Sequence, residues 1–283
     1  MGRRRRSDTR LRVAPYTLDE TEGKETASAV EGQSAGTYEG PGQPDWAPGV
    51  VGNALLLDGR GGHINCGQAF SPERTDAFSY GCWILGENEW YAAVLAKMDP
   101  ENDDRGFDLL LDNSGCIAAH VKHQWPEMYL KTMSITPLPR RQWHHVLMTY
   151  DGSSFAAGMT IYVDGKAAAA KVLADRLSET IRNSVPLRIG TRDATYPFRG
   201  RIDDVRIYNR SLRAEEVSQL YKSGLLSLAH IPAQNRGPHQ QAALATYYRP
   251  LDEPLRSLRN QLEAADTALR DAIPVAAAFG RVV

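Results

Sequence analysis

The chain has 283 residues, of which 33 are basic and 34 acidic, so its formal net charge is −1. This balance provides no global field for nucleic acid or an anionic membrane, and we expect no nucleic-acid partner. The apolar runs, such as residues 54–57, are far shorter than the roughly 20 residues that cross a bilayer, so we expect no membrane span. The 42% of apolar residues suffices for the core of one domain of about 200 residues.

The first twelve residues contain an arginine run at positions 3–6, followed by Ser7, Asp8 and Arg10. An export signal would need an apolar stretch at that place, so no signal peptide is expected. A nucleic-acid patch would need interleaved aromatic residues, and none occurs before Tyr16. We interpret residues 1–12 as a disordered basic arm.

Turn signals recur about every ten residues from Val13 to Tyr208, with short runs of β-branched and aromatic residues between them. Asp-Gly pairs at 151–152 and 164–165 end two of these runs, and such pairs tolerate the positive φ of tight reversals. About a dozen strands result, more than an immunoglobulin domain has. The sequence therefore predicts an all-β, jelly-roll sandwich of two antiparallel sheets over residues 13–224.

Between residues 20 and 50 the composition shifts to Gly, Ser, Pro, Thr and Glu. Prolines lack the N–H group that a sheet ladder requires. We interpret this segment as a long surface loop of the sandwich.

Helical signals follow the strands. Ser211 is placed to cap a first turn and Gly224 to stop it, so a helix closes the sandwich there. The mixed, proline-containing residues 225–250 are interpreted as a linker. In residues 251–274 leucines recur at steps of three and four, which predicts an amphipathic helix that starts a truncated C-terminal domain, before an apolar tail at 275–283. Its leucine stripe would pack on the sandwich, self-associate or dock onto a domain that this chain lacks.

The three cysteines are isolated and form no CxxC or CxxCH motif. This excludes c-type haem attachment and the usual zinc knuckles within the chain. Each lies inside a strand-like run, so we expect small, buried side chains at Cys66, Cys82 and Cys116.

Four segments in the same order resemble the LamG-like, concanavalin A-like jelly roll: residues 52–59, 143–146, 161–166 and 200–212. The resemblance covers about residues 13–223. It implies a two-sheet sandwich whose members mostly bind carbohydrate or protein ligands, some of them with calcium.

A second resemblance concerns the remainder of the chain. Residues 231–236, the pair Tyr247 and Tyr248, and the leucine-striped helix that ends at Pro274 are similar to a junction in Planctomycete cytochrome c proteins. There a LamG-like module is followed by a further C-terminal domain. The resemblance implies a large exported multidomain protein, and hence a secreted, periplasmic or cell-envelope location.

A carbohydrate groove needs flat aromatic faces for sugar rings and a few polar side chains that fix their orientation. Five side chains at predicted loop edges have this chemistry: Trp90, Tyr91, His123, Trp125 and Tyr129. The alternative is that they cap the core of the sandwich. Because a strand directs neighbouring side chains to opposite faces, His144 and His145 cannot act together as a metal pair.

Calcium requires six to eight oxygen ligands. The LamG-like resemblance places Asp58 and Asp203 near each other, and Gly59, Gly61 and Gly62 would let carbonyl groups approach an ion. The alternatives are a turn role for Asp58 and a solvated or arginine-paired Asp203. The acidic residues within 99–104 lack the spacing of a calcium loop, and we interpret them as a solvated hairpin tip.

The sequence thus predicts a noncatalytic recognition module that binds carbohydrate, with calcium as a possible cofactor. The first alternative is a structural or protein-interaction sandwich that docks to a partner through its C-terminal helix. The second is a weak glycoside hydrolase that uses Glu87 and Glu89. Those two glutamates lie in a predicted hairpin loop, whereas an acid catalyst needs a raised pKa, so we expect no enzymatic activity.

Overall fold

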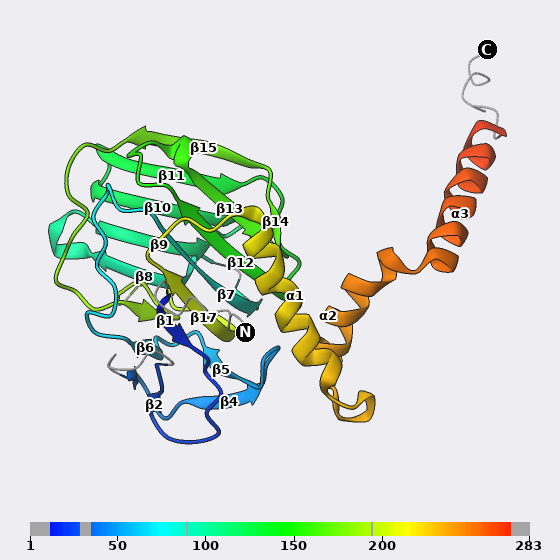
Figure 1. The fold of residues 1–283 in the computed structure, drawn as a ribbon, viewed down its shortest axis with the longest axis horizontal. Coiled ribbons are helices and arrows are strands. Elements are labelled where there is room, and N and C mark those ends of the chain that lie inside the picture. The colour runs from blue at the N-terminus through cyan, green and yellow to red at the C-terminus, as the bar shows by residue number, and fades with distance from the viewer. Residues whose placement is uncertain (1–11, 29–34, 89, 194, 273–283) are drawn as a thin grey trace, which may run out of the picture.

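The computed structural model describes residues 12–28, 35–88, 90–193 and 195–272 (Figure 1). Within these ranges two antiparallel sheets face each other, and three helices follow the last strand. The predicted all-β sandwich with a C-terminal helix is therefore confirmed. Most of the predicted basic arm, residues 1–11, and the predicted tail at 275–283 lie outside the described residues.

The first sheet has eight strands, in the order β14-β13-β12-β7-β17-β5-β4, with β1 also paired to β17. Its strands are β1 (Arg12–Tyr16), β4 (Asp45–Pro48), β5 (Asn53–Asp58), β7 (Phe78–Gly86), β12 (Trp143–Tyr150), β13 (Met159–Val163), β14 (Lys166–Ala167) and β17 (Arg199–Tyr208).

The second sheet has nine strands, in the order β15-β11-β10-β9-β8-β16-β6-β3-β2. They are β2 (Glu25–Thr26), β3 (Gly36–Glu39), β6 (His63–Asn65), β8 (Ala92–Asp99), β9 (Arg105–Leu111), β10 (Ile117–Gln124), β11 (Met128–Ser134), β15 (Ala170–Arg176) and β16 (Arg188–Ile189). Two short 3₁₀ turns, η2 (Pro100–Asn102) and η3 (Ala156–Gly158), join neighbouring strands.

The predicted long loop at residues 20–50 holds three short strands, β2, β3 and β4, so that prediction is wrong in part. β2 and β4 lie at the edges of their sheets. One side of an edge strand has no neighbouring strand. A proline such as Pro48 is tolerated there when its nitrogen, which has no hydrogen to donate, faces that free side. The loop-like composition of this segment therefore gave no indication of its strands.

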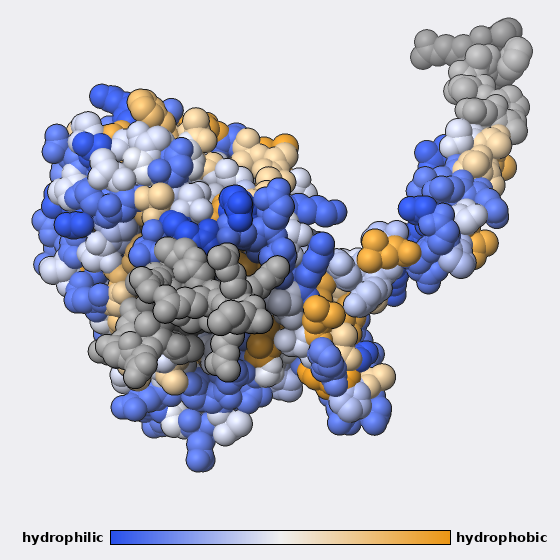
Figure 2. All heavy atoms as spheres, viewed as in Figure 1, coloured by the Kyte–Doolittle hydropathy of each residue, from blue (hydrophilic) through white to orange (hydrophobic). Residues whose placement is uncertain are grey.

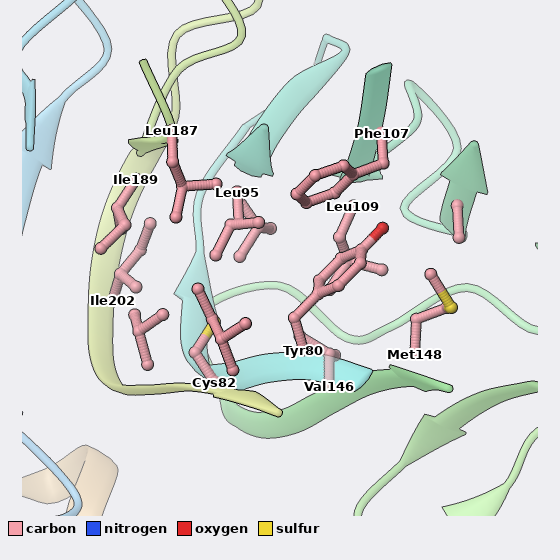
Figure 3. Packing of buried hydrophobic residues seen from close by; sticks show 14 of the residues in the cluster. Tyr80, Cys82, Leu95, Phe107, Leu109, Val146, Met148, Leu187, Ile189 and Ile202 are labelled. Atoms are coloured by element: carbon pink, nitrogen blue, oxygen red, sulfur yellow. The ribbon is translucent and has the colours of Figure 1, made fainter. Parts of the chain in front are cut away.

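The main core lies between the two sheets and consists of alternate residues from both (Figure 3). Phe107 of β9 packs with its ring centroid 5.2 Å from that of Tyr80 on β7. Cys82 belongs to this core. All three cysteines are buried and free, which confirms their predicted role as small buried side chains.

Three helices follow β17: α1 (Ala214–His230), α2 (Pro238–Tyr248) and α3 (Glu253–Ala272), with η4 (Ala233–Asn235) and η5 (Arg249–Leu251) between them. The predicted helix end at Gly224 is wrong, because α1 continues to His230. The predicted linker 225–250 is also largely helical. Ser211 does not cap α1; instead, the backbone N–H of Arg213 donates to the Glu216 carboxylate at 2.9 Å.

A second apolar cluster joins α1 and α2 to the outer face of the eight-stranded sheet. Tyr221 of α1 stacks on Trp83 of β7 with ring centroids 5.4 Å apart. The Gln240 side chain of α2 donates to the Gly49 carbonyl at 2.7 Å. Gly224 is buried in this contact, since a Cβ there would lie 2.6 Å from Trp83 Nε1. Close packing, and not helix termination, explains this glycine.

α3 leads away from the sandwich in Figure 1. Its leucines Leu258, Leu262 and Leu269 are exposed. None of the helices among the described residues has the length and apolar character needed to cross a membrane.

Replacing Gly224 by Ala tests the helix–sheet packing. Alanine favours a helix by about 1 kcal/mol over glycine, but the clash with Trp83 costs about 1–3 kcal/mol. We expect a net loss of up to about 2 kcal/mol in the free energy of unfolding, measured by urea denaturation. The matched variant Ser223→Ala, at an exposed neighbouring position, should change stability by less than about 0.5 kcal/mol. A more stable Gly224→Ala protein would contradict this packing.

Candidate functional site

The outer face of the nine-stranded sheet carries charged side chains on neighbouring strands. On β9 and β10 the residues Phe107, Leu109, Ala119 and Val121 belong to the core. Because successive strand residues point to opposite faces, Asp108, His120 and Lys122 point away from the core. The pairing sets His120 opposite Asp108 across the two strands.

These side chains form a network with two residues from loops. His120 Nδ1 lies 2.7 Å from Asp108 Oδ1, and Arg192 Nε lies 3.3 Å from Asp108 Oδ2. Asp104 Oδ2 accepts hydrogen bonds from Arg192 Nη2 at 2.8 Å and from Lys122 Nζ at 3.4 Å. We call Asp104, Asp108, His120, Lys122 and Arg192 the charge cluster.

Asp104 corrects one prediction. It follows η2 in the acidic segment that we interpreted as a solvated hairpin tip, yet its carboxylate is only 25% exposed and bridges two cations. Asp99, in the same segment, is buried and caps η2 by accepting from the Glu101 N–H. Residues 101–103 are exposed, as expected of a hairpin tip, so the prediction is wrong for Asp99 and Asp104 only.

Burial and charge set the protonation of the cluster. Burial opposes ionisation of Asp108, but His120, Arg192 and Lys122 outweigh it and lower the pKa of this carboxyl to about 2. Burial lowers the pKa of the His120 imidazole, which favours a neutral ring that donates from Nδ1 to Asp108. Burial also lowers the pKa of Lys122, against the attraction of Asp108.

Two of the predicted ligand residues, Trp125 and Tyr129, come together at one end of the cluster. Their ring centroids are 4.9 Å apart, with an angle of 49° between the planes. Lys122 Nζ lies 4.8 Å from the Trp125 ring centroid, a cation–π distance. Trp125 is 47% exposed, so about half of this aromatic residue is open to solvent beside a buried amine. We call Trp125 and Tyr129 the aromatic pair.

Trp90 and Tyr91 lie toward the Arg192 side. The Tyr91 ring centroid is 5.9 Å from that of Tyr196, and the Arg192 guanidinium lies 5.4 Å from the Tyr196 ring. The Trp90 indole N–H donates to the Pro197 carbonyl at 3.3 Å. Both rings are about 40% exposed, Trp90 at 41% and Tyr91 at 40%. The charge cluster thus connects Tyr91, by way of Tyr196, to the aromatic pair.

His123 has a different environment. Its Nδ1 lies 2.7 Å from the Thr180 carbonyl oxygen, and its own carbonyl accepts from Arg105 Nε at 3.4 Å. The first contact holds the segment that follows β15 against the end of β10, and the second joins β9 to β10. His123 is thus engaged by backbone groups, and its role in ligand binding stays a prediction.

The two predicted metal ligands are not brought together. Asp58 is paired with Arg199 in the β5–β17 ladder, and Asp203 lies four residues further along β17, roughly 13 Å away at about 3.3 Å per residue. Asp203 is buried and accepts from the backbone N–H groups of Val50 and Val51 at 2.6 and 2.8 Å. Burial raises its pKa well above the ordinary range, which disfavours an anionic ligand.

Asp58 is exposed and accepts from the Arg60 backbone N–H at 2.9 Å, as in an ordinary turn. No cluster of three or more His, Cys, Asp or Glu side chains suited to a metal occurs among the described residues. Calcium needs several convergent oxygens, so Asp58 and Asp203 do not fit a shared calcium site.

The adjacent histidines occupy opposite faces of β12, as predicted. His144 Nδ1 lies 2.9 Å from Asp164 Oδ2, whereas the His145 ring packs 5.4 Å from Trp83 under α1. Burial lowers the pKa of His145 to about 4. Both residues therefore have structural roles.

The hydrolase alternative rests on Glu87 and Glu89. Glu87 Oε2 lies 3.7 Å from Arg199 Nε, and its side chain is partly exposed. Glu89 lies outside the described residues.

Sequence reasoning missed the charge cluster, although a signal exists for part of it. In β10 the polar His120 and Lys122 alternate with the apolar Ala119 and Val121, and Asp108 interrupts an apolar strand. One polar face was therefore readable. Arg192 lies in a loop more than eighty residues from Asp108, and only the fold brings the two together.

Comparison with known proteins decides the family. Residues 58–218, more than half of the chain, match the model of the concanavalin A-like lectin/glucanases superfamily. The chain belongs to this family. A comparison with curated proteins finds no match.

Solved structures share the fold of this lectin/glucanase family member. Domain 4 of AbnA, a GH43 extracellular arabinanase from Geobacillus stearothermophilus, solved with arabinotriose, has a TM-score of 0.55 and 19% identity, covering 75% of this chain and 98% of that domain. The botulinum neurotoxin serotype G binding domain has a TM-score of 0.57 and 14% identity, covering 76% and 51%. The serotype D ligand binding domain, in complex with N-acetylneuraminic acid, has a TM-score of 0.53 and 13% identity, covering 76% and 51%. The chain thus spans about half of each neurotoxin domain, and these likenesses show the fold alone.

The charge cluster predicts a pH-dependent effect of Asp108→Asn. The folded pKa of about 2 lies below the ordinary 3.8, so the stability from ionised Asp108 is complete above pH 4 and is lost as pH falls through 2. This shift corresponds to roughly 2–3 kcal/mol. We expect the stability gap between wild type and variant, from urea unfolding, to shrink by roughly 1 kcal/mol between pH 7 and pH 3.

Asp45→Asn, at an exposed position of β4, is the control, and its small gap should stay flat over the same range. A gap for Asp108→Asn that did not change with pH would show that the cluster does not hold this carboxylate in its charged form.

Proposed function

We propose that this chain is a noncatalytic recognition module that binds carbohydrate on the outer face of the nine-stranded sheet. One observation carries the proposal. The aromatic pair, with Trp125 about half exposed, stands directly beside the buried Lys122 amine of the charge cluster. Flat apolar rings next to fixed polar groups are what a sugar ring, apolar on its faces and polar at its rim, requires.

The charge cluster can supply the polar contacts. Asp104 is partly exposed at its carboxylate and is already oriented by Lys122 and Arg192. Hydrogen bonds from hydroxyl groups to charged side chains are about twice as strong as those between neutral groups. A sugar stacked on Trp125 would place its rim toward this carboxylate and the neighbouring cations.

The site is also rigid before any ligand arrives. Lys122 and Arg192 are buried and interlocked with carboxylates, and the Trp125 backbone N–H donates to the Asp103 carbonyl at 2.8 Å. Side chains held in place in the free protein lose little conformational entropy when they bind. Tyr91 and Trp90 would extend the surface toward a second sugar unit.

Relatives of the same fold support the ligand class. One arabinanase domain was solved with arabinotriose, and one neurotoxin domain with N-acetylneuraminic acid. The arabinanase is described as extracellular, which supports our expectation of an exported protein. The similarity of residues 231–274 to a junction in Planctomycete cytochrome c multidomain proteins supports the same setting, and it stays a prediction.

The decisive experiment is a glycan array probed with the full chain, first with calcium and then with a chelator. We expect selective binding in both arms, because Asp58 and Asp203 do not form a calcium site. If no glycan is bound either with calcium or with the chelator, carbohydrate binding would be contradicted. The alternative of a structural or protein-interaction sandwich would then be favoured. Binding lost only in the chelator arm would sustain carbohydrate recognition and overturn our reading of the two aspartates.

Trp125→Ala tests the aromatic pair. Loss of a stacking face in a binding site costs 1 kcal/mol or more, so we expect about tenfold weaker binding of the array-selected glycan in calorimetry. The melting temperature should change little, because the side chain is half exposed. Tyr248→Ala removes an aromatic ring of matched exposure, 45%, from α2 and should leave binding unchanged. A folded Trp125→Ala protein with full affinity would place the ligand elsewhere.

A further inference from the structure

The leucine stripe of α3 has no partner among the described residues. Leu258, Leu262 and Leu269 are 62%, 64% and 61% exposed. Figure 2 shows apolar residues along the projecting end of the molecule, in otherwise hydrophilic surroundings. A lone helix of this length is marginal in water, because most helical stability comes from packing of the apolar face.

The spacing of the stripe specifies what would cover it. Leu258, Leu262, Ala265 and Leu269 follow one another at steps of four, three and four residues. This is the heptad period of 3.5 residues, in which the a and d positions form a narrow seam for a second helix. In this register Leu262 and Leu269 are a positions, and Leu258 and Ala265 are d positions.

The charges beside the seam identify the orientation of the second helix. The e positions of the register are Arg259 and Asp266, and the g positions are Gln261 and Ala268. In an antiparallel pair the e positions of the two helices face each other, so Arg259 would face Asp266 of an identical helix. Two-fold symmetry repeats the contact, which gives two attractive pairs and no repulsive one. A parallel pair would set e against g and would contain no ion pair.

The side chains in an antiparallel pair also match in size. When Leu262 opposes Ala265 of the second helix, Leu258 opposes the second Leu269. Each large residue therefore meets either the small alanine or another leucine, so the helices can approach closely without a gap. The ion pairs between Arg259 and Asp266 fall in the same register.

The shape of the molecule allows this arrangement. α3 leads away from the sandwich, which lies at the N-terminal end of the helix (Figure 1). Antiparallel pairing would place the two sandwiches at opposite ends of the helix pair. Parallel pairing would force both sandwiches, with their α1–α2 hairpins, to the same end.

We propose that α3 pairs antiparallel with α3 of a second copy of this chain, joining two recognition modules into a symmetric dimer. The seam consists of Leu258, Leu262, Ala265 and Leu269, and the e-position charges select the orientation. The proposal does not depend on what ligand the sandwich binds.

Sedimentation equilibrium of the full chain over a concentration series tests the proposal. Wild type should show a reversible monomer–dimer equilibrium. Leu262→Asp places a charge in the middle of the seam and should yield only monomer. A wild-type protein that stays monomeric at every concentration would overturn the proposal.

A charge exchange separates the antiparallel pair from any other assembly. Arg259→Asp and Asp266→Arg each create two like-charge contacts, and each should raise the dimer dissociation constant about tenfold. The double variant Arg259→Asp with Asp266→Arg should return to the wild-type value. Arg270→Asp makes the same charge change at an outward b position and should have no effect. Failure of the double variant to recover would overturn the antiparallel arrangement, even if the chain dimerises.

Discussion

Asp108 is ionised although it is fully buried, and the polar face of the nine-stranded sheet depends on this interaction. A charge removed from water must be compensated at close range. His120 compensates from the next strand and Arg192 from a loop, while Lys122 adds its positive charge from the same strand as His120. The loop after β16 is thereby tied to the sheet, and the position of Tyr196 follows from that of Arg192. One buried carboxylate thus orders side chains from several parts of the chain.

The opposite face of the molecule is governed by apolar contact. Trp83 and Tyr221 stack between β7 and α1, and the buried glycine of α1 lets the helix approach the indole. Asp203 belongs to this side as well, where it accepts two backbone N–H groups of the loop between β4 and β5. Its neutral form can serve there without a counter-charge, because burial raises its pKa. The pKa values of two buried aspartates in one sandwich therefore shift in opposite directions, because cations surround Asp108, whereas Asp203 is buried beside the carboxylate of Asp204.

Most of the fold could be predicted from local patterns in the sequence. The Asp-Gly pairs are reversals in the structure, with positive φ at both Asp164 and Gly165, and alternation located the central strands. The short strands at 25–26, 36–39 and 45–48 were missed, because they have only two to four residues each and their composition is that of a loop. The extension of α1 past Gly224 was missed because the reason for that glycine is Trp83, more than a hundred residues earlier.

The candidate site divides in the same way. Residue chemistry alone singled out Trp125 and Tyr129, which the structure brings together, and Trp90 with Tyr91. Residue chemistry could not show that Lys122 contacts Trp125 and that Arg192 contacts Tyr196. A lysine or arginine in a buried network cannot be distinguished by sequence from one on the surface. The pairing of Asp58 with Asp203 rested on a resemblance, and strand register separates them.

The α1–α2 hairpin lies over the eight-stranded sheet, and within the part of the chain that the structure describes no helix covers the other sheet. An object too large to enter a cleft, such as a polymer chain or a cell wall, can therefore contact a whole sheet face of the sandwich only at the nine-stranded sheet. The fold itself thus makes the module directional, and whatever is attached through the helices lies on the side turned away from the encounter.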